Sequence, residues 1–148
     1  MGTKDQASNA LETLLRSQPL AVLATHCDGQ PHASLVAYAA SEDLKHLVFA
    51  TPKSTRKYTN ILADDRVAML IDSRSNRVSD FEQAAAVTVT GHAREQDRNT
   101  SGRFAEFFLA KHRHLAEFVA SPASALIIVD VDRYSLVTGF QDVVEFRM

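Results

Sequence analysis

The chain consists of short apolar runs that alternate with polar turns, a pattern that predicts a protein made mainly of β-strands. The predicted strands are 20–25, 32–40, 45–50, 66–72, 86–95, 125–131, 134–137 and 143–146. Asp28-Gly29 is a tight-turn signal between the first two strands, which we therefore expect to form a hairpin. Gly91 interrupts the alternation of 86–95 and predicts a β-bulge. The run 67–71 is apolar throughout, so we expect both of its faces to be covered.

One helix is predicted before the first strand. Asn9 followed by Glu12 resembles a capping box, and leucines at helical spacing follow, which together predict a helix over 9–17. The polar residues 1–8 are expected to fray.

Two further helices are predicted among the strands. A short one opens at 54–57, and a longer one with an aromatic face covers 99–119, with a break around 111–114. The polar segment 72–83 has neither a helical nor a strand period, so we expect it to serve a function or an interface. Hairpin-linked strands with few crossovers favour an antiparallel barrel of six or seven strands with flanking helices over a doubly wound sheet.

Length, composition and charge narrow the class of protein. The 148 residues are 45% hydrophobic, enough for one domain over residues 1–148. A net charge of −2 gives no general attraction to nucleic acid or to a membrane surface, so any anion site must be local. The single cysteine excludes an internal disulfide, and the N-terminus lacks the apolar core of a signal peptide. We therefore expect a cytoplasmic protein with a small-molecule ligand.

The start of the second helix carries the strongest chemical signal. Two hydroxyls, Ser54 and Thr55, are followed directly by two cations, Arg56 and Lys57. The unpaired N–H groups at a helix start and its positive dipole end attract an anion, and hydroxyl, guanidinium and ammonium groups add further donors. The sequence therefore indicates a phosphate site. The alternative is an ordinary helix cap followed by solvated charges.

Three segments carry a family resemblance: LATHCDGQPHASLVAY, LVFATPKSTRKYTNILADDRV and AVTVTGHARE. Together they resemble the pyridoxamine 5′-phosphate oxidase-like family, whose fold is the FMN-binding split barrel. The resemblance extends over about residues 9–137. It implies a split β-barrel homodimer with two flavin sites at the subunit interface.

Carried over by position, the resemblance implies specific cofactor contacts. The residues that would contact the flavin phosphate are Thr51, Thr55, Arg56 and Lys57. The residues that would lie along the isoalloxazine ring and the ribityl chain are Ser34, Leu35, Val36 and Ala37. The family's oxidases have an Arg at Ser34, a Lys near Ala39 and a Gln at Ala86. These departures argue against vitamin B6 oxidation and leave the phosphate end intact.

The polar loop 73–77 has two readings. It is either a solvated turn or a segment that reaches the flavin across a dimer interface, with Arg74 and Asn76 as the candidates. The sequence does not predict a metal site. His26, Cys27 and His32 flank one turn and could meet, but three such ligands without a carboxylate ligand or a CxxC partner are a weak signal for a metal site.

The resulting expectation is an FMN-dependent oxidoreductase acting on an unidentified small molecule. No catalytic side chain is assigned, because the flavin supplies the chemistry. Three alternatives stay open: a non-catalytic flavin-binding or electron-transfer protein, a deazaflavin in place of FMN, and a haem-binding relative. Some haem-degrading relatives use a histidine late in the chain, and here none follows His114.

Overall fold

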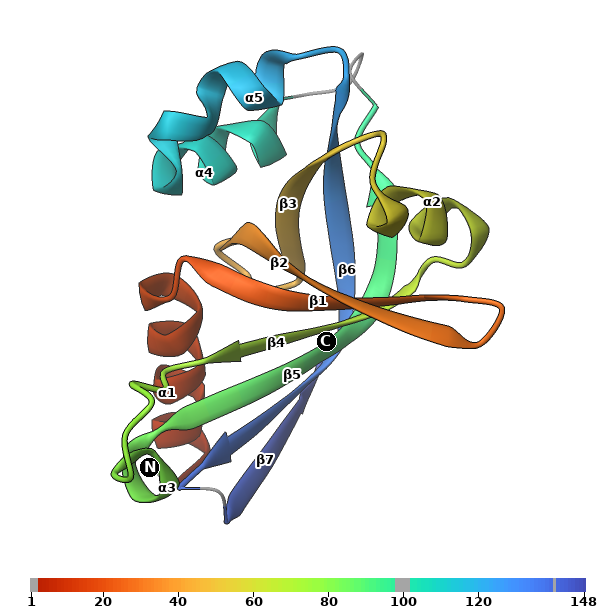
Figure 1. The fold of residues 1–148 in the computed structure, drawn as a ribbon. Helices are drawn as coiled ribbons and strands as arrows, with labels where there is room; N and C mark the ends of the chain where they lie inside the picture. Colours follow the sequence, from red (N-terminus) through yellow and green to blue (C-terminus); the bar gives the residue numbers. More distant parts are fainter. Residues whose placement is uncertain (1–2, 98–101, 140) are drawn as a thin grey trace.

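The structure is a computed structural model that describes residues 3–97, 102–139 and 141–148. Its strands are β1 (Leu20–Cys27), β2 (Gln30–Ala40), β3 (His46–Pro52), β4 (Arg66–Asp72), β5 (Ala85–Glu95), β6 (Ser124–Thr138) and β7 (Asp142–Arg147). All pair antiparallel in the order β3-β2-β1-β4-β5-β6-β7, and β3 also pairs with β6. Six strands therefore close into a barrel that β7 extends (Figure 1). The predicted antiparallel barrel is confirmed.

The long strand β6 closes the barrel. One of its edges pairs with β5, and the other pairs first with β3 and then with β7. The separate strands predicted at 125–131 and 134–137 are thus wrong, because they are parts of one strand. The predicted bulge is confirmed, since the β5–β6 register shifts between Thr90 and Gly91. Asp132, the extra residue opposite this shift, is exposed and breaks the apolar pattern that the sequence shows.

The apolar core fills the barrel and continues onto α1 (Thr3–Ser17). Leucines of α1 join inward-facing side chains of β1 to β6 in one buried cluster. The helix begins well before the predicted 9–17, so the expected fraying of residues 3–8 is wrong. Ala7 and Ala10 pack against the core, and Asp5 lies in the first turn, where a carboxylate favours the helix dipole. Residues 1–2 lie outside the described part of the chain.

A second apolar cluster lies outside the barrel, beneath α4 (Arg103–Lys111), the 3-10 turn η1 (Arg113–Leu115) and α5 (Ala116–Ala120). The break predicted in the helix over 99–119 is confirmed, and residues 99–101 of that prediction lie outside the described ranges. The break has a physical cause. His112 is buried, and its Nε2 lies 2.7 Å from the carbonyl oxygen of Tyr38 on β2. This contact directs the end of α4 toward the sheet.

Two local predictions fail around β4. The burial of its residues alternates, and Leu70 on the outer face is 39% exposed. Within the chain, therefore, only the inner face of β4 is covered. In addition, the segment 72–83 contains a one-turn helix, α3 (Asp80–Gln83). Its four residues are too few to show a helical period in the sequence.

Within the described ranges, no helix combines the length and hydrophobicity of a membrane-spanning segment.

Candidate functional site

The predicted phosphate loop forms the start of α2 (Arg56–Ala63), directly after β3. Thr55 caps the helix, since its hydroxyl accepts a hydrogen bond from the N–H of Tyr58 at 3.3 Å. Thr51 is buried, and its hydroxyl lies 2.8 Å from that of Thr55. Thr51 therefore supports the cap from below, while Ser54 and Arg56 are exposed.

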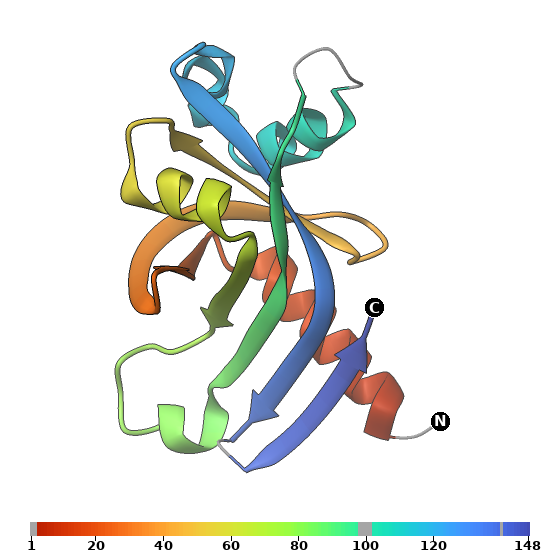
Figure 2. The same cartoon turned by 90° about the vertical axis from the view of Figure 1, so that its right-hand side faces the viewer.

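Two side-chain contacts fix α2 against the barrel. Asn60 is buried and donates from Nδ2 to Oγ1 of Thr25 on β1, at 3.0 Å. The Tyr58 hydroxyl donates to Glu95 on β5 at 2.6 Å, and this hydrogen bond raises the pKa of Tyr58. The start of α2 is therefore held beside the hairpin of β1 and β2 (Figure 2).

A cavity of about 540 Å³ lies between this hairpin and the start of α2. It is lined by Cys27, Gln30, His32, Ser54, Thr55, Arg56, Thr59 and Asn60, and we call it the polar cavity. Within the described residues, the Arg56 guanidinium has no carboxylate partner. The backbone N–H groups of Ser54, Arg56 and Lys57 also make no hydrogen bond there. The cavity thus presents free donors and an uncompensated positive charge, which suit an anion.

The hairpin wall of this cavity was missed in the sequence. Thr25 pairs with His32 and Cys27 with Gln30, so all four side chains share the face turned toward α2. The Asp-Gly turn fixes this register, and that signal could have shown which residues share a face. It could not have shown that the face meets α2, because this depends on the contact of Asn60 with β1.

The predicted ring-binding segment of β2 is divided between two faces. Ser34 and Val36 point inward, and the buried Oγ of Ser34 has no hydrogen-bond partner within the described residues. Leu35 points outward and is 65% exposed, whereas Ala37 packs beneath α4 and its neighbours. A ligand on one side of the strand would therefore meet only alternate side chains.

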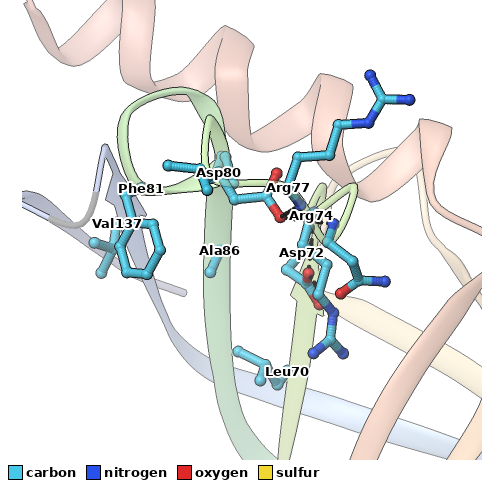
Figure 3. Close-up of a pocket in the computed structure, with 12 residues that line it drawn as sticks. Leu70, Asp72, Arg74, Arg77, Asp80, Phe81, Ala86 and Val137 are labelled. Carbon is cyan, nitrogen blue, oxygen red and sulfur yellow. Dashed lines mark hydrogen bonds and ion pairs between the residues drawn. The ribbon is translucent and has the colours of Figure 1, made fainter.

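Arg74 and Asn76 line a second cavity of about 700 Å³ (Figure 3). We call it the apolar cavity; its lining is Leu70, Asp72, Arg74, Asn76, Arg77, Val78, Asp80, Phe81, Ala84, Ala85, Ala86 and Val137. The Nε of Arg74 lies 3.0 Å from Oδ2 of Asp72, so this pair carries no net charge. Leu70, Ala86 and Val137 form an apolar floor, and Phe81 stands beside it with 69% of its surface exposed.

The loop that carries Arg74 and Asn76 is an anchored turn. The Asp80 carboxylate accepts hydrogen bonds from the N–H groups of Ser75, Asn76 and Arg77, at 2.8 to 3.3 Å. These hydrogen bonds lower the pKa of Asp80, with that of Ser75 first. Asn76 has a φ of 64°, the left-handed region that Asn tolerates. The cap at Thr55 and this turn lie at different ends of the barrel (Figures 1 and 2).

Residues 7–138 match the family described as "Pyridoxamine 5′-phosphate oxidase". The chain belongs to this family. The family resemblance inferred from the three sequence segments is therefore confirmed. The comparison with curated proteins found no match.

Three solved structures show the same fold at low identity. A haem-binding protein from Mycobacterium smegmatis has 19% identity and a TM-score of 0.83 over 95% of this chain. A FAD-binding protein from Mesorhizobium loti has 18% identity and a TM-score of 0.70 over 87% of this chain. General Stress Protein 26 from Bacillus anthracis has 18% identity and a TM-score of 0.68 over 97% of this chain. The matches cover 57%, 90% and 99% of those three chains, respectively.

Proposed function

We propose that the protein binds FMN with the phosphate in the polar cavity, and that it acts as an FMN-dependent oxidoreductase on a small molecule. The observation that carries this proposal is the Arg56 guanidinium, which has no partner among the described residues, beside N–H groups at the start of α2 that make no hydrogen bond to them. The chain as a whole has a net charge of −2, so this local positive site is not a by-product of a basic surface.

The residues present fit a phosphate monoester. Arg56 can give two parallel hydrogen bonds, and the Ser54 hydroxyl and the free amides supply further donors. Lys57 is half-buried on the same first turn and adds a second cationic side chain. Bound flavin would supply hydride or electron transfer, and the chain would anchor it, orient it and exclude water. Thr51 would act indirectly, by holding the cap residue Thr55 in place.

We further propose that a second copy of the chain completes the site. Val22 pairs with Leu35 on one side and with Leu70 on the other, so these side chains share the outer face of three adjacent strands. Leu35 and Leu70 are exposed, as are Val78 and Phe81 beside the apolar cavity. A contiguous apolar face of this kind favours association. The apolar cavity with its neutral Asp72–Arg74 pair suits the uncharged ring of a flavin held by the partner copy.

The absorption spectrum of protein purified without added ligand tests the proposal. We expect flavin bands from the wild-type protein, and FMN rather than riboflavin after extraction. The double variant Arg56→Ala/Lys57→Ala should be folded and colourless. The matched control Lys4→Ala/Arg16→Ala removes two exposed charges from α1 and should stay yellow. Equal flavin content in both double variants would contradict the placement of the phosphate.

Haem is the second candidate ligand. The haem-binding protein of M. smegmatis has the same fold. The polar cavity contains two side chains of iron-ligating types, Cys27 and His32. None of the described side chains that line the apolar cavity is a histidine, cysteine, methionine or tyrosine. A Soret band in place of flavin absorbance would favour haem.

Two further outcomes would refine the flavin assignment. A deazaflavin carries a phosphate that the polar cavity would also accept, and the extracted cofactor would identify it. A non-catalytic flavin-binding or electron-transfer role would be indicated by yellow protein that consumes neither reduced nicotinamide nor oxygen.

A further inference from the structure

His32 forms part of the hairpin wall of the polar cavity, opposite the start of α2. Its side chain is half-buried and makes no hydrogen bond or ion pair within the described residues. The other histidine of the hairpin differs in this respect. His26 points away from the cavity, and its Nε2 lies 3.0 Å from Oδ2 of Asp64.

Among the described residues, no group that faces His32 across the polar cavity carries a negative charge. From α2, the lining residues are Arg56, Thr59 and Asn60, of which only Arg56 is charged. From β1, Cys27 lines the same cavity, with its sulfur 3.9 Å from Oδ2 of Asp28 in the exposed turn. No carboxylate is among the described residues that line the cavity. An anion between the two walls would therefore be the natural partner of a protonated His32.

The hairpin face also carries an unused polar atom. The hydroxyl of Ser34 lies two residues along the strand from His32 on the same face, and it is buried with no hydrogen-bond partner in the part of the chain that the structure describes. Buried hydroxyls are ordinarily hydrogen-bonded, so an unpaired one calls for an explanation such as a ligand. The hairpin wall thus contributes the imidazole of His32, which among the described residues has no partner, opposite the Arg56 guanidinium of α2. The hydroxyl of Ser34 lies deeper on the same face of the strand, toward the barrel core.

We propose that His32 is a second, titratable cation of the polar cavity, which selects phosphorylated over unphosphorylated ligands when its imidazole is protonated. A guanidinium keeps its charge at all physiological pH values, whereas an imidazole gains its charge only toward acid. The two walls would then hold the phosphate from opposite sides. This inference rests on the proposed binding of FMN, and it adds a pH-dependent selection for the phosphate.

Calorimetric titrations with FMN and with riboflavin, at about pH 6 and about pH 8.5, separate the charge of His32 from its packing. His32→Gln should weaken FMN binding about fivefold at the lower pH, as for a half-exposed charge pair, and leave it nearly unchanged at the higher pH. Riboflavin affinity should not change at either pH. His32→Arg should restore tight FMN binding at both pH values. The control His26→Gln removes an imidazole of the same hairpin that faces away from the cavity, and it should bind FMN like the wild type.

The comparison of each variant with the wild type removes the titration of the FMN phosphate itself, because both proteins are measured with the same ligand at the same pH. An equal loss for both flavins, or an equal loss at both pH values, would overturn the inference and give His32 a structural role. Wild-type protein that binds neither flavin would overturn the proposed function, and this inference with it. FMN binding that His32→Gln leaves unchanged at both pH values would overturn the inference alone.

Discussion

Replacing Gly91 by alanine tests how the barrel closes. A Cβ atom at this position would lie 2.3 Å from the carbonyl oxygen of Asp130 and 3.1 Å from Cγ1 of Val129. The nearest atom belongs to the backbone of β6, so no side-chain rotation relieves the overlap. The two strands would have to separate at the bulge. Overpacking costs about 1–3 kcal/mol, and the ladder hydrogen bonds lost nearby cost about 1 kcal/mol each.

One effect of Gly91→Ala acts in the opposite direction. Alanine restricts the unfolded chain and returns about 0.4–1 kcal/mol. The net loss in the free energy of unfolding should therefore be about 2–3 kcal/mol. For a chain of this size that corresponds to a fall in Tm of roughly 5–10 °C.

Urea and thermal unfolding at one protein concentration measure the loss. The control Thr88→Ala changes an exposed residue of the same strand and should stay within about 0.5 kcal/mol of the wild type. If Gly91→Ala were as stable as Thr88→Ala, the close approach of β5 and β6 would be refuted.

Three further predictions concern titrating and hydrogen-bonding groups. Burial, with a smaller contribution from nearby Arg16, lowers the pKa of Lys111 to about 8, from the ordinary lysine value of 10.5. Between these two pH values the unfolded chain binds more protons than the folded one, so the free energy of unfolding should rise from pH 8 to pH 10.5. Lys111→Met should abolish this rise in urea unfolding. The hydrogen bond to Asp65 raises the pKa of His92. The stabilising effect of this pair should therefore be present at acid pH and lost as pH rises through the raised pKa. An NMR titration of Asp65→Asn should show a lower pKa for His92, and an unchanged pKa would contradict the prediction. Thr51→Val removes the hydroxyl contact to the α2 cap residue Thr55, and it should lower the free energy of urea unfolding by about 1 kcal/mol. It should also weaken FMN binding more than riboflavin binding. Equal weakening of the two would refute the supporting role of Thr51.

The sequence predicts the barrel well where a strand has one buried face. In β5, Val87 and Val89 alternate with Thr88 and Thr90, and this alternation matches the burial in the structure. Prediction fails where long-range contacts decide. The polar first turns of α1 are helical because alanines farther along pack on the core. The strand β6 continues through the exposed Asp132, because its pairing partners hold it on both sides.

The sequence predicts the α2 side of the candidate site but not the hairpin side. Hydroxyls and cations at a helix start predict an anion site from local chemistry alone, and in the described part of the chain the Arg56 guanidinium has no partner. The facing wall with His32 depends on how the hairpin is turned toward α2, which the buried contact between Asn60 and Thr25 sets. A sequence pattern carries no record of that contact. For the same reason, only the fold reveals that the loop before α3 lies at another end of the barrel from α2.

The ratio of riboflavin to FMN dissociation constants tests the central claim most directly, because the two ligands differ only in the phosphate. Charge-assisted hydrogen bonds contribute about 1.5–3 kcal/mol each, so Arg56→Ala should lower this ratio about 10- to 100-fold. Arg16→Ala, which removes an exposed charge from α1, should leave the ratio at its wild-type value. A ratio that stays the same in Arg56→Ala would contradict the account, since the phosphate would then be held somewhere else.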